Sequence, residues 1–94
     1  MLNKKYFLSE DWSLQKIELG QDVKYYLLNI RDGDIYRLND TSYTFLILFD
    51  GNLTCDEIIK KLTEIYNVDK EKIKKDFEKM VSIWLEKGIL KEGR

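Results

Sequence analysis

The chain has 94 residues, of which 44% are aliphatic, aromatic or cysteine and 35% are charged, a balance typical of one small globular domain. Its net charge is −1, from 16 basic and 17 acidic residues, so it lacks the positive excess of a strong nucleic-acid-binding protein. The absence of histidine and the single cysteine, Cys55, exclude histidine-based catalysis, an internal disulfide and a thiolate zinc site.

The first half of the chain predicts three short strands in an antiparallel meander. Residues 12–18 alternate roughly between apolar and polar side chains, which suits a half-buried strand. A turn is expected at 20–22, followed by a dense aromatic and aliphatic strand over 24–30. The third strand, 34–38, has no later strand to pair with, so we expect it at the edge of the sheet.

The connection between the second and third strands carries a hairpin signal. Asp32-Gly33 stands between two apolar runs, which predicts a two-residue type I′ turn because both central residues need a positive φ. That turn places Ile30 opposite Ile35. In the same register Leu28 faces Arg37.

The second half of the chain predicts three helices, each with its own start signal. Asn39 is expected to cap a first helix over 40–49, which 50–51 (Asp-Gly) then ends. Thr54 and Glu57 form a capping box that opens a second helix. One face of the second helix is apolar at helical spacing: Ile58, Ile59, Leu62, Ile65 and Tyr66.

The third helix shows the same agreement between cap and stripe. Asp69 is expected to cap it, and Gly88 is expected to stop it, so that Ile89 and Leu90 pack back on the body. The two ends of the chain, 1–6 and 91–94, are expected to be loose. The apolar stripe of the third helix consists of Ile73, Phe77, Met80, Val81 and Trp84.

Residues that could carry chemistry have ordinary structural explanations. Cys55 falls in the first turn of a helix, where the helix dipole can lower a thiol pKa, but it has no partner and is interpreted as a structural residue. Asp32, Asp34 and Asp40 fall at a turn and near a cap, without the ligand number of a calcium site. The lysines of the third helix alternate with acidic residues, as on a solvated helix surface. We therefore expect a protein that is not an enzyme and holds neither metal nor cofactor.

Two side chains widen the apolar face of the third helix beyond what a core of this size requires. On a helical projection Ile83 falls on one flank of the stripe and Leu85 on the other. A free strand edge beside a partly apolar helix is a groove for an incoming strand, which binds by β-augmentation. The alternative is that Ile83 is a scattered surface aliphatic and that the N-terminal segment covers the edge.

Six short segments, taken in order, carry a resemblance to a known family: Ile-Tyr-Arg-Leu-Asn at 35–39, Phe-Asp-Gly at 49–51, Thr-Cys-Asp-Glu-Ile-Ile at 54–59, Leu62 with Tyr66, Asp76-Phe77, and Leu-Glu-Lys-Gly-Ile-Leu at 85–90. With this order and spacing the chain resembles the PqqD-like proteins, the precursor-peptide recognition elements of ribosomally made, modified peptides. The resemblance covers roughly 12–90. The chain departs from the family pattern in two ways. It lacks proline, and it carries Ile83 and Leu85 at positions where many members have a charged residue.

The resemblance implies an α+β, winged-helix-like fold, a three-stranded antiparallel sheet followed by a three-helix bundle. It also implies that the leader segment of a precursor peptide adds as a strand to the third strand, in a cleft walled by the third helix. Carried over by position, the peptide-binding residues of the strand are Asp34, Ile35, Tyr36, Arg37 and Leu38. Those of the helix are Lys72, Asp76, Lys79, Met80 and Ile83.

We therefore expect a free-standing leader-peptide binding protein, a single domain over 1–94 with its ordered core at about 12–90. It would present the precursor to a separate modifying enzyme, either a radical-SAM enzyme or, as the hairpin sequence favours, the leader protease of lasso-peptide biosynthesis. No signal segment and no long apolar run are present, so a cytoplasmic protein without a membrane partner is expected. A free edge leaves open whether it is a monomer or a strand-swapped dimer. The alternative function is a winged-helix DNA-binding transcriptional regulator.

Overall fold

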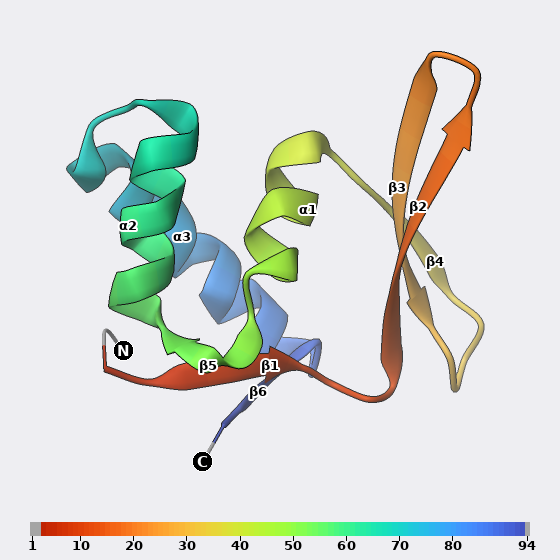
Figure 1. Cartoon of the computed structure of the whole chain (residues 1–94). Helices are drawn as coiled ribbons and strands as arrows, with labels where there is room; N and C mark the ends of the chain where they lie inside the picture. The colour runs from red at the N-terminus through yellow and green to blue at the C-terminus, as the bar shows by residue number, and fades with distance from the viewer. Residues whose placement is uncertain (1–2, 94) are drawn as a thin grey trace.

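The structure, a computed structural model, describes residues 3–93 and contains two three-stranded sheets and three helices. One sheet has the order β2-β3-β4 and the other β5-β1-β6. Figure 1 shows α1 between the α2–α3 pair and the β2-β3-β4 sheet. The elements are β1 Lys5–Leu8, β2 Trp12–Leu19, β3 Asp22–Asn29, β4 Ile35–Leu38, α1 Asp40–Ile47, β5 Asp50–Thr54, α2 Cys55–Tyr66, α3 Lys70–Glu86 and β6 Leu90–Glu92.

The predicted meander is confirmed as the β2-β3-β4 sheet, in which every pair is antiparallel. The β2–β3 hairpin closes between the paired residues Leu19 and Asp22. Gly20, at the first turn position, has φ +62°, a conformation that glycine adopts without steric cost. Alternation along the strands turns Leu27 into the core, where it is 1% exposed, and leaves Ile17 on the opposite, outer face.

The predicted register of the β3–β4 hairpin is wrong. A two-residue turn would place Ile30 opposite Ile35 and Leu28 opposite Arg37, but the structure pairs Leu28 with Ile35. The shift of two residues keeps each side chain on its expected face, because the side-chain period of a strand is also two.

Local hydrogen bonds explain the longer loop. The Oδ1 atom of Asn29 accepts the N–H groups of Arg31 and Asp32, each at 3.0 Å, which bends the chain immediately after β3. The N–H of Ile30 donates to the carbonyl of Asp11 at 2.8 Å, so Ile30 pairs with the chain before β2. The hydrogen bonds of the Asn29 side chain therefore determine the conformation of this loop, and the Asp-Gly dipeptide does not form the predicted two-residue turn.

The expectation of loose chain ends is wrong for the residues that the structure describes. Tyr6 in β1 pairs with Glu92 in β6, and β1 pairs on its other side with β5. These short strands bury apolar side chains against the helices: Tyr6 is 4% exposed and Leu90 is 2% exposed. Residues 1–2 and 94 lie outside the described part of the chain.

The first helix begins as predicted and ends earlier. The Oδ1 atom of Asn39 accepts the N–H of Ser42 at 2.7 Å, which confirms the N-cap. The helix ends at Ile47 instead of Phe49, because the chain turns there into β5 to pair with β1. Strand β5 was not predicted, since its sequence Asp-Gly-Asn-Leu-Thr reads locally as a turn.

The second helix carries the predicted capping box. The side chain of Thr54 accepts the N–H of Glu57 at 3.2 Å, and a carboxylate oxygen of Glu57 accepts the N–H of Thr54 at 2.9 Å. Hydrogen bonding of the carboxylate to the backbone N–H and then to the side chain of Thr54 lowers the pKa of Glu57. Ile65 is an exception to the predicted apolar face, because it is 56% exposed.

The third helix is stopped as expected but not capped as expected. Asp69 stands at the N-cap position and makes no side-chain capping bond. At the other end Gly88 has φ +75°, the N–H of Ile89 donates to the carbonyl of Trp84, and that of Gly88 donates to Leu85. These two bonds form a Schellman motif, which directs Ile89 and Leu90 into the core.

The core lies where the three helices meet the two sheets. Phe77, on α3, is fully buried; its ring stacks on Phe49 at 5.6 Å and lies 6.2 Å from Phe45. Trp84 meets Phe49 edge to face at 6.2 Å. This aromatic cluster joins α3 to α1 and to the segment that follows α1.

Candidate functional site

Strand β4 is an edge strand, as the sequence predicts. In the order β2-β3-β4 it pairs with β3 on one side, and no described strand lies on its other side. The alternative that the N-terminal segment covers this edge is wrong, because β1 pairs with β5 and β6 in the other sheet. The backbone of β4 is therefore available to an added strand.

The hydrogen-bond phase identifies which residues of β4 face outward. The N–H of Asn29 donates to the carbonyl of Asp34 at 2.8 Å, which makes that pair a hydrogen-bonded one. Such pairs alternate along an antiparallel ladder, so Tyr36 and Leu38 bond to β3. The N–H and C=O groups of Ile35 and Arg37 consequently point away from the sheet, toward the free edge.

A small hollow lies between β4 and the C-terminal part of α3. Its volume is about 130 Å³, and its lining is mostly apolar. On the strand side Tyr36 is 45% exposed, and on the helix side Ile83 is 42% exposed, so both present apolar atoms to solvent at its rim. The lining residues are Leu27, Tyr36, Leu38, Ile83, Trp84, Lys87 and Ile89. We call this the groove hollow.

The ring of Tyr36 is held in place from two sides. The ammonium nitrogen of Lys87 lies 5.6 Å from its centroid, within the range of a cation–π contact. The ring of Trp12 lies 5.8 Å away at a tilt of 37°. Tyr36 therefore forms one wall of the groove hollow, and the ammonium group of Lys87 lies beside that wall.

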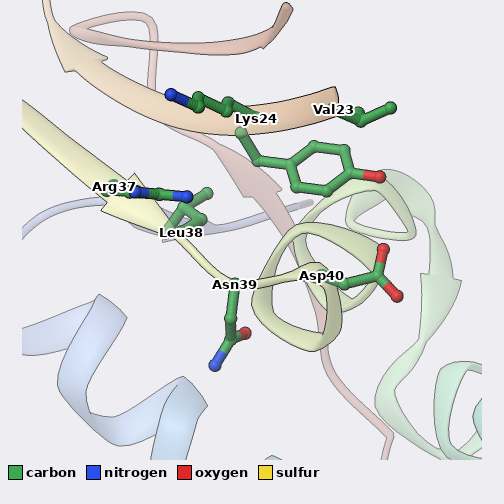
Figure 2. Close-up of a pocket in the computed structure, with 7 residues that line it drawn as sticks. Val23, Lys24, Arg37, Leu38, Asn39 and Asp40 are labelled. Atoms are coloured by element: carbon green, nitrogen blue, oxygen red, sulfur yellow. The ribbon is translucent and has the colours of Figure 1, made fainter. Parts of the chain in front are cut away.

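A second, larger hollow adjoins the first along β4. It measures about 490 Å³ and shares Leu38 with the groove hollow. It opens where the chain leaves β4 and enters α1, beside the part of β3 that extends beyond β4 and pairs only with β2 (Figure 2). Its lining is more polar: Val23, Lys24, Tyr25, Arg37, Leu38, Asn39 and Asp40. We call this the end hollow.

The predicted strand residues divide between the two faces of β4. Tyr36 and Leu38 line the groove hollow, and Arg37 lines the end hollow. Ile35, which is 65% exposed, lies on the outer face of the sheet. There it lines a third, apolar hollow of about 400 Å³ with Gln15, Ile17, Tyr26 and Leu28.

The predicted helix residues come together with the strand only in part. Ile83 lines the groove hollow, so its flank of α3 is the one that faces β4. Lys72, Asp76 and Lys79 are exposed nearer the N-terminal end of α3 and do not line it. Met80 is half-buried against the core.

Four residues of the groove hollow were not among the predicted site residues. Lys87 follows Ile83 by one helical turn and so shares its flank, which helical spacing alone could have shown. Trp84 was predicted to be a core residue, and in the structure it both belongs to the core and lines the groove hollow. Leu27 and Ile89 reach the hollow only through the packing of β3 and of the chain after α3.

Cys55 is structural, as the sequence analysis concluded. It is 1% exposed, and burial raises its pKa from the ordinary 9.0 to about 11. We expect iodoacetamide to alkylate Cys55 about a hundredfold more slowly in the folded chain than in urea at mildly alkaline pH, since the thiolate fraction falls by that factor. Equal rates, measured by mass spectrometry, would show an accessible thiol.

Other kinds of site were sought in residues 3–93. No group of three or more histidine, cysteine, aspartate or glutamate side chains is placed to hold a metal ion there. Within the same residues, no helix combines the length and the hydrophobicity that crossing a membrane requires.

The chain is similar to known proteins in its sequence family and in its fold. The family described as "Coenzyme PQQ synthesis protein D (PqqD)" matches residues 24–90. The fold is similar to that of a solved structure described as "TbiB1 in Complex with the TbiA(beta) Leader Peptide", with a TM-score of 0.70 and 16% identity, over 90% of this chain and 94% of that one. No curated protein matches the sequence.

Proposed function

Because the chain belongs to the PqqD family, we propose that it binds the leader segment of a ribosomally made precursor peptide by strand addition to β4. The observation that carries the proposal is a free strand edge directly beside an apolar hollow on α3. A protein of the same fold is described in complex with a leader peptide, which supports this use of the fold.

In this proposal the backbone of β4 supplies affinity for the leader, and side chains supply selectivity. The outward N–H and C=O groups of Ile35 and Arg37 give an added strand affinity with little demand on its sequence. The groove hollow supplies selection, because a leader side chain opposite Tyr36 enters it. A volume of about 130 Å³ suits one aliphatic or small aromatic side chain.

The proposed binding residues follow from this arrangement. On the strand they are the five predicted positions 34–38, with Tyr36 and Leu38 toward the hollow. On the helix Ile83 is the central contact, joined by Trp84 and Lys87. Lys72, Asp76, Lys79 and Met80 are proposed as contacts only for a leader that extends beyond the hollow along α3.

The role proposed for the whole chain is presentation without catalysis. A single domain of 94 residues would hold the precursor in the cytoplasm, where ribosomes make it, for a separate modifying enzyme. A radical-SAM enzyme and the leader protease of lasso-peptide biosynthesis are the two candidate partners. The chemistry of the proposed site, backbone pairing and one apolar hollow, serves either partner.

A display library of random short peptides, panned over the full chain, tests the proposal. Backbone pairing makes little demand on sequence, so the library is expected to contain binders, and the tightest of them serves as the reference peptide below. Strand addition should change little with salt, whereas DNA binding should collapse between low and physiological salt. A chain that enriches no peptide but binds duplex DNA with that salt dependence would instead be a winged-helix regulator.

Ile83→Glu is expected to weaken binding of the reference peptide about thirtyfold. Ile83 is 42% exposed, so the free protein should lose only about 0.5 kcal/mol of stability. In the complex the new carboxylate leaves water against an apolar side chain, at a cost of about 2 kcal/mol. A titration and a thermal melt measure the two effects.

The matched control for this variant is Ile65→Glu. Ile65 is 56% exposed on α2 and lines none of the three hollows described above. The same chemical change there should leave both the melt and the dissociation constant nearly unchanged. If the two variants bind the reference peptide equally well, the peptide does not occupy the groove hollow.

A further inference from the structure

Two basic side chains lie on the outer face of the sheet near the proposed path of the leader: Arg37 on β4, at the free edge, and Lys24 on β3, one strand further from it. Strand alternation places Arg37 and Lys24 on the face opposite to Tyr36 and Leu38. Within residues 3–93 neither takes part in an ion pair.

The acidic residue of the end hollow is directed elsewhere. In Figure 2 the carboxylate of Asp40 lies on the side away from the ends of Lys24 and Arg37. Asp40 instead lies at Tyr25, whose pKa is raised by desolvation and then by a hydrogen bond to that carboxylate. The basic pair is therefore not neutralised by its own neighbourhood.

An added strand places one of its side chains directly opposite Arg37. Residues that face each other across an antiparallel pair lie on the same side of the sheet with Cβ atoms about 5 Å apart, and opposite charges there attract. Since the side chain of Arg37 is on the outer face, its leader neighbour also lies there. The leader residues before and after it face the opposite way, toward Tyr36 and Leu38.

Resting on the strand addition proposed above, we propose that the leader segment paired with β4 carries an acidic residue between two apolar residues. The acidic side chain lies opposite Arg37, with Lys24 adding to the positive potential. The apolar side chain opposite Tyr36 enters the groove hollow, and the one opposite Leu38 lies on the same face, where Leu38 borders both the groove hollow and the end hollow. This pattern is the same in both chain directions, so it holds for parallel and antiparallel addition.

Sequencing the peptides enriched by panning the random library over the full chain tests this pattern. We expect an apolar–acidic–apolar triplet among them. Synthetic versions of the reference peptide with Glu, Gln or Lys at the centre should then bind in that order of affinity. Each step should change the dissociation constant roughly two- to fivefold, the range of a cross-strand ion pair at a partly exposed position.

Charge reversal in the protein completes the test. Arg37→Glu is expected to invert the order, so that the Lys peptide binds best, because the new pair has opposite charges again. Lys60→Glu, on the exposed side of α2, changes the net charge equally and should keep the original order. A thermal melt checks that both variants are folded.

The outcomes separate this inference from the proposed function. Peptides that bind and show apolar residues but no preference among Glu, Gln and Lys would overturn the inference and leave strand addition standing. The same holds if Arg37→Glu keeps the original order. No enriched peptide from the wild-type chain would overturn the proposed function, and the inference with it.

Discussion

Replacing Phe77 with alanine is expected to lower the free energy of unfolding by about 3–5 kcal/mol, the cost of deleting a fully buried aromatic ring. Phe77 is 0% exposed and contacts Phe49 and Phe45 at the centre of the core. A domain of this size has a total stability of roughly 5–8 kcal/mol, so the variant should be largely unfolded on modest warming. Urea denaturation followed by circular dichroism measures the change.

Phe77→Leu is the control for that variant. It keeps an apolar side chain of intermediate size and should cost clearly less than Phe77→Ala, because a smaller cavity remains. A loss below about 1 kcal/mol for Phe77→Ala would show that the ring is not the centre of the core. The wall of the groove would then depend on other contacts, since Phe77 and Trp84 meet through Phe49.

Ile35→Pro is expected to weaken binding of the reference peptide about a hundredfold while leaving the fold intact. The N–H of Ile35 points to the free edge, so its loss removes no bond to β3, and proline is tolerated at the start of an edge strand. In the complex the ring stands where a leader carbonyl must accept that N–H. The lost bond, the unsatisfied carbonyl and the steric conflict together cost about 3 kcal/mol.

Two further variants make the result specific to the backbone. Ile35→Ala keeps the N–H and should bind the reference peptide within a few-fold of the wild type, because the side chain is 65% exposed on the outer face. Tyr36→Pro removes an N–H that bonds to β3 and should destabilise the sheet itself. If Ile35→Pro binds as well as Ile35→Ala in a titration, the peptide does not pair with β4.

The helices follow from local signals, which is why the sequence predicts them well. The Asn39 cap, the Thr54–Glu57 capping box and the stop at Gly88 each depend on hydrogen bonds between residues a few positions apart. The flank position of Ile83 also follows from spacing along one helix. These features need no knowledge of the rest of the chain.

The errors share a different cause. Strands β1, β5 and β6 are short and lack a strong pattern of their own, and they exist because segments distant in sequence pair with one another. The β3–β4 register depends on the Asn29 side chain and on the bond from Ile30 to Asp11, which belongs to the chain before β2. The Asp-Gly dipeptide alone reveals neither the effect of the Asn29 side chain nor the bond from Ile30 to Asp11.

By itself the sequence determined three helices, a meander with a free third strand and an apolar flank on the last helix, because caps, periodicity and chain order are local properties. Only the tertiary structure decided that Ile83, Tyr36 and Leu38 share one hollow, that Ile35 and Arg37 turn their backbone groups outward, and that Lys87 lies over Tyr36. Those facts depend on contacts between segments that are distant in the sequence. The aromatic cluster that joins α3 to α1 and the segment after it is likewise assembled only in the folded chain.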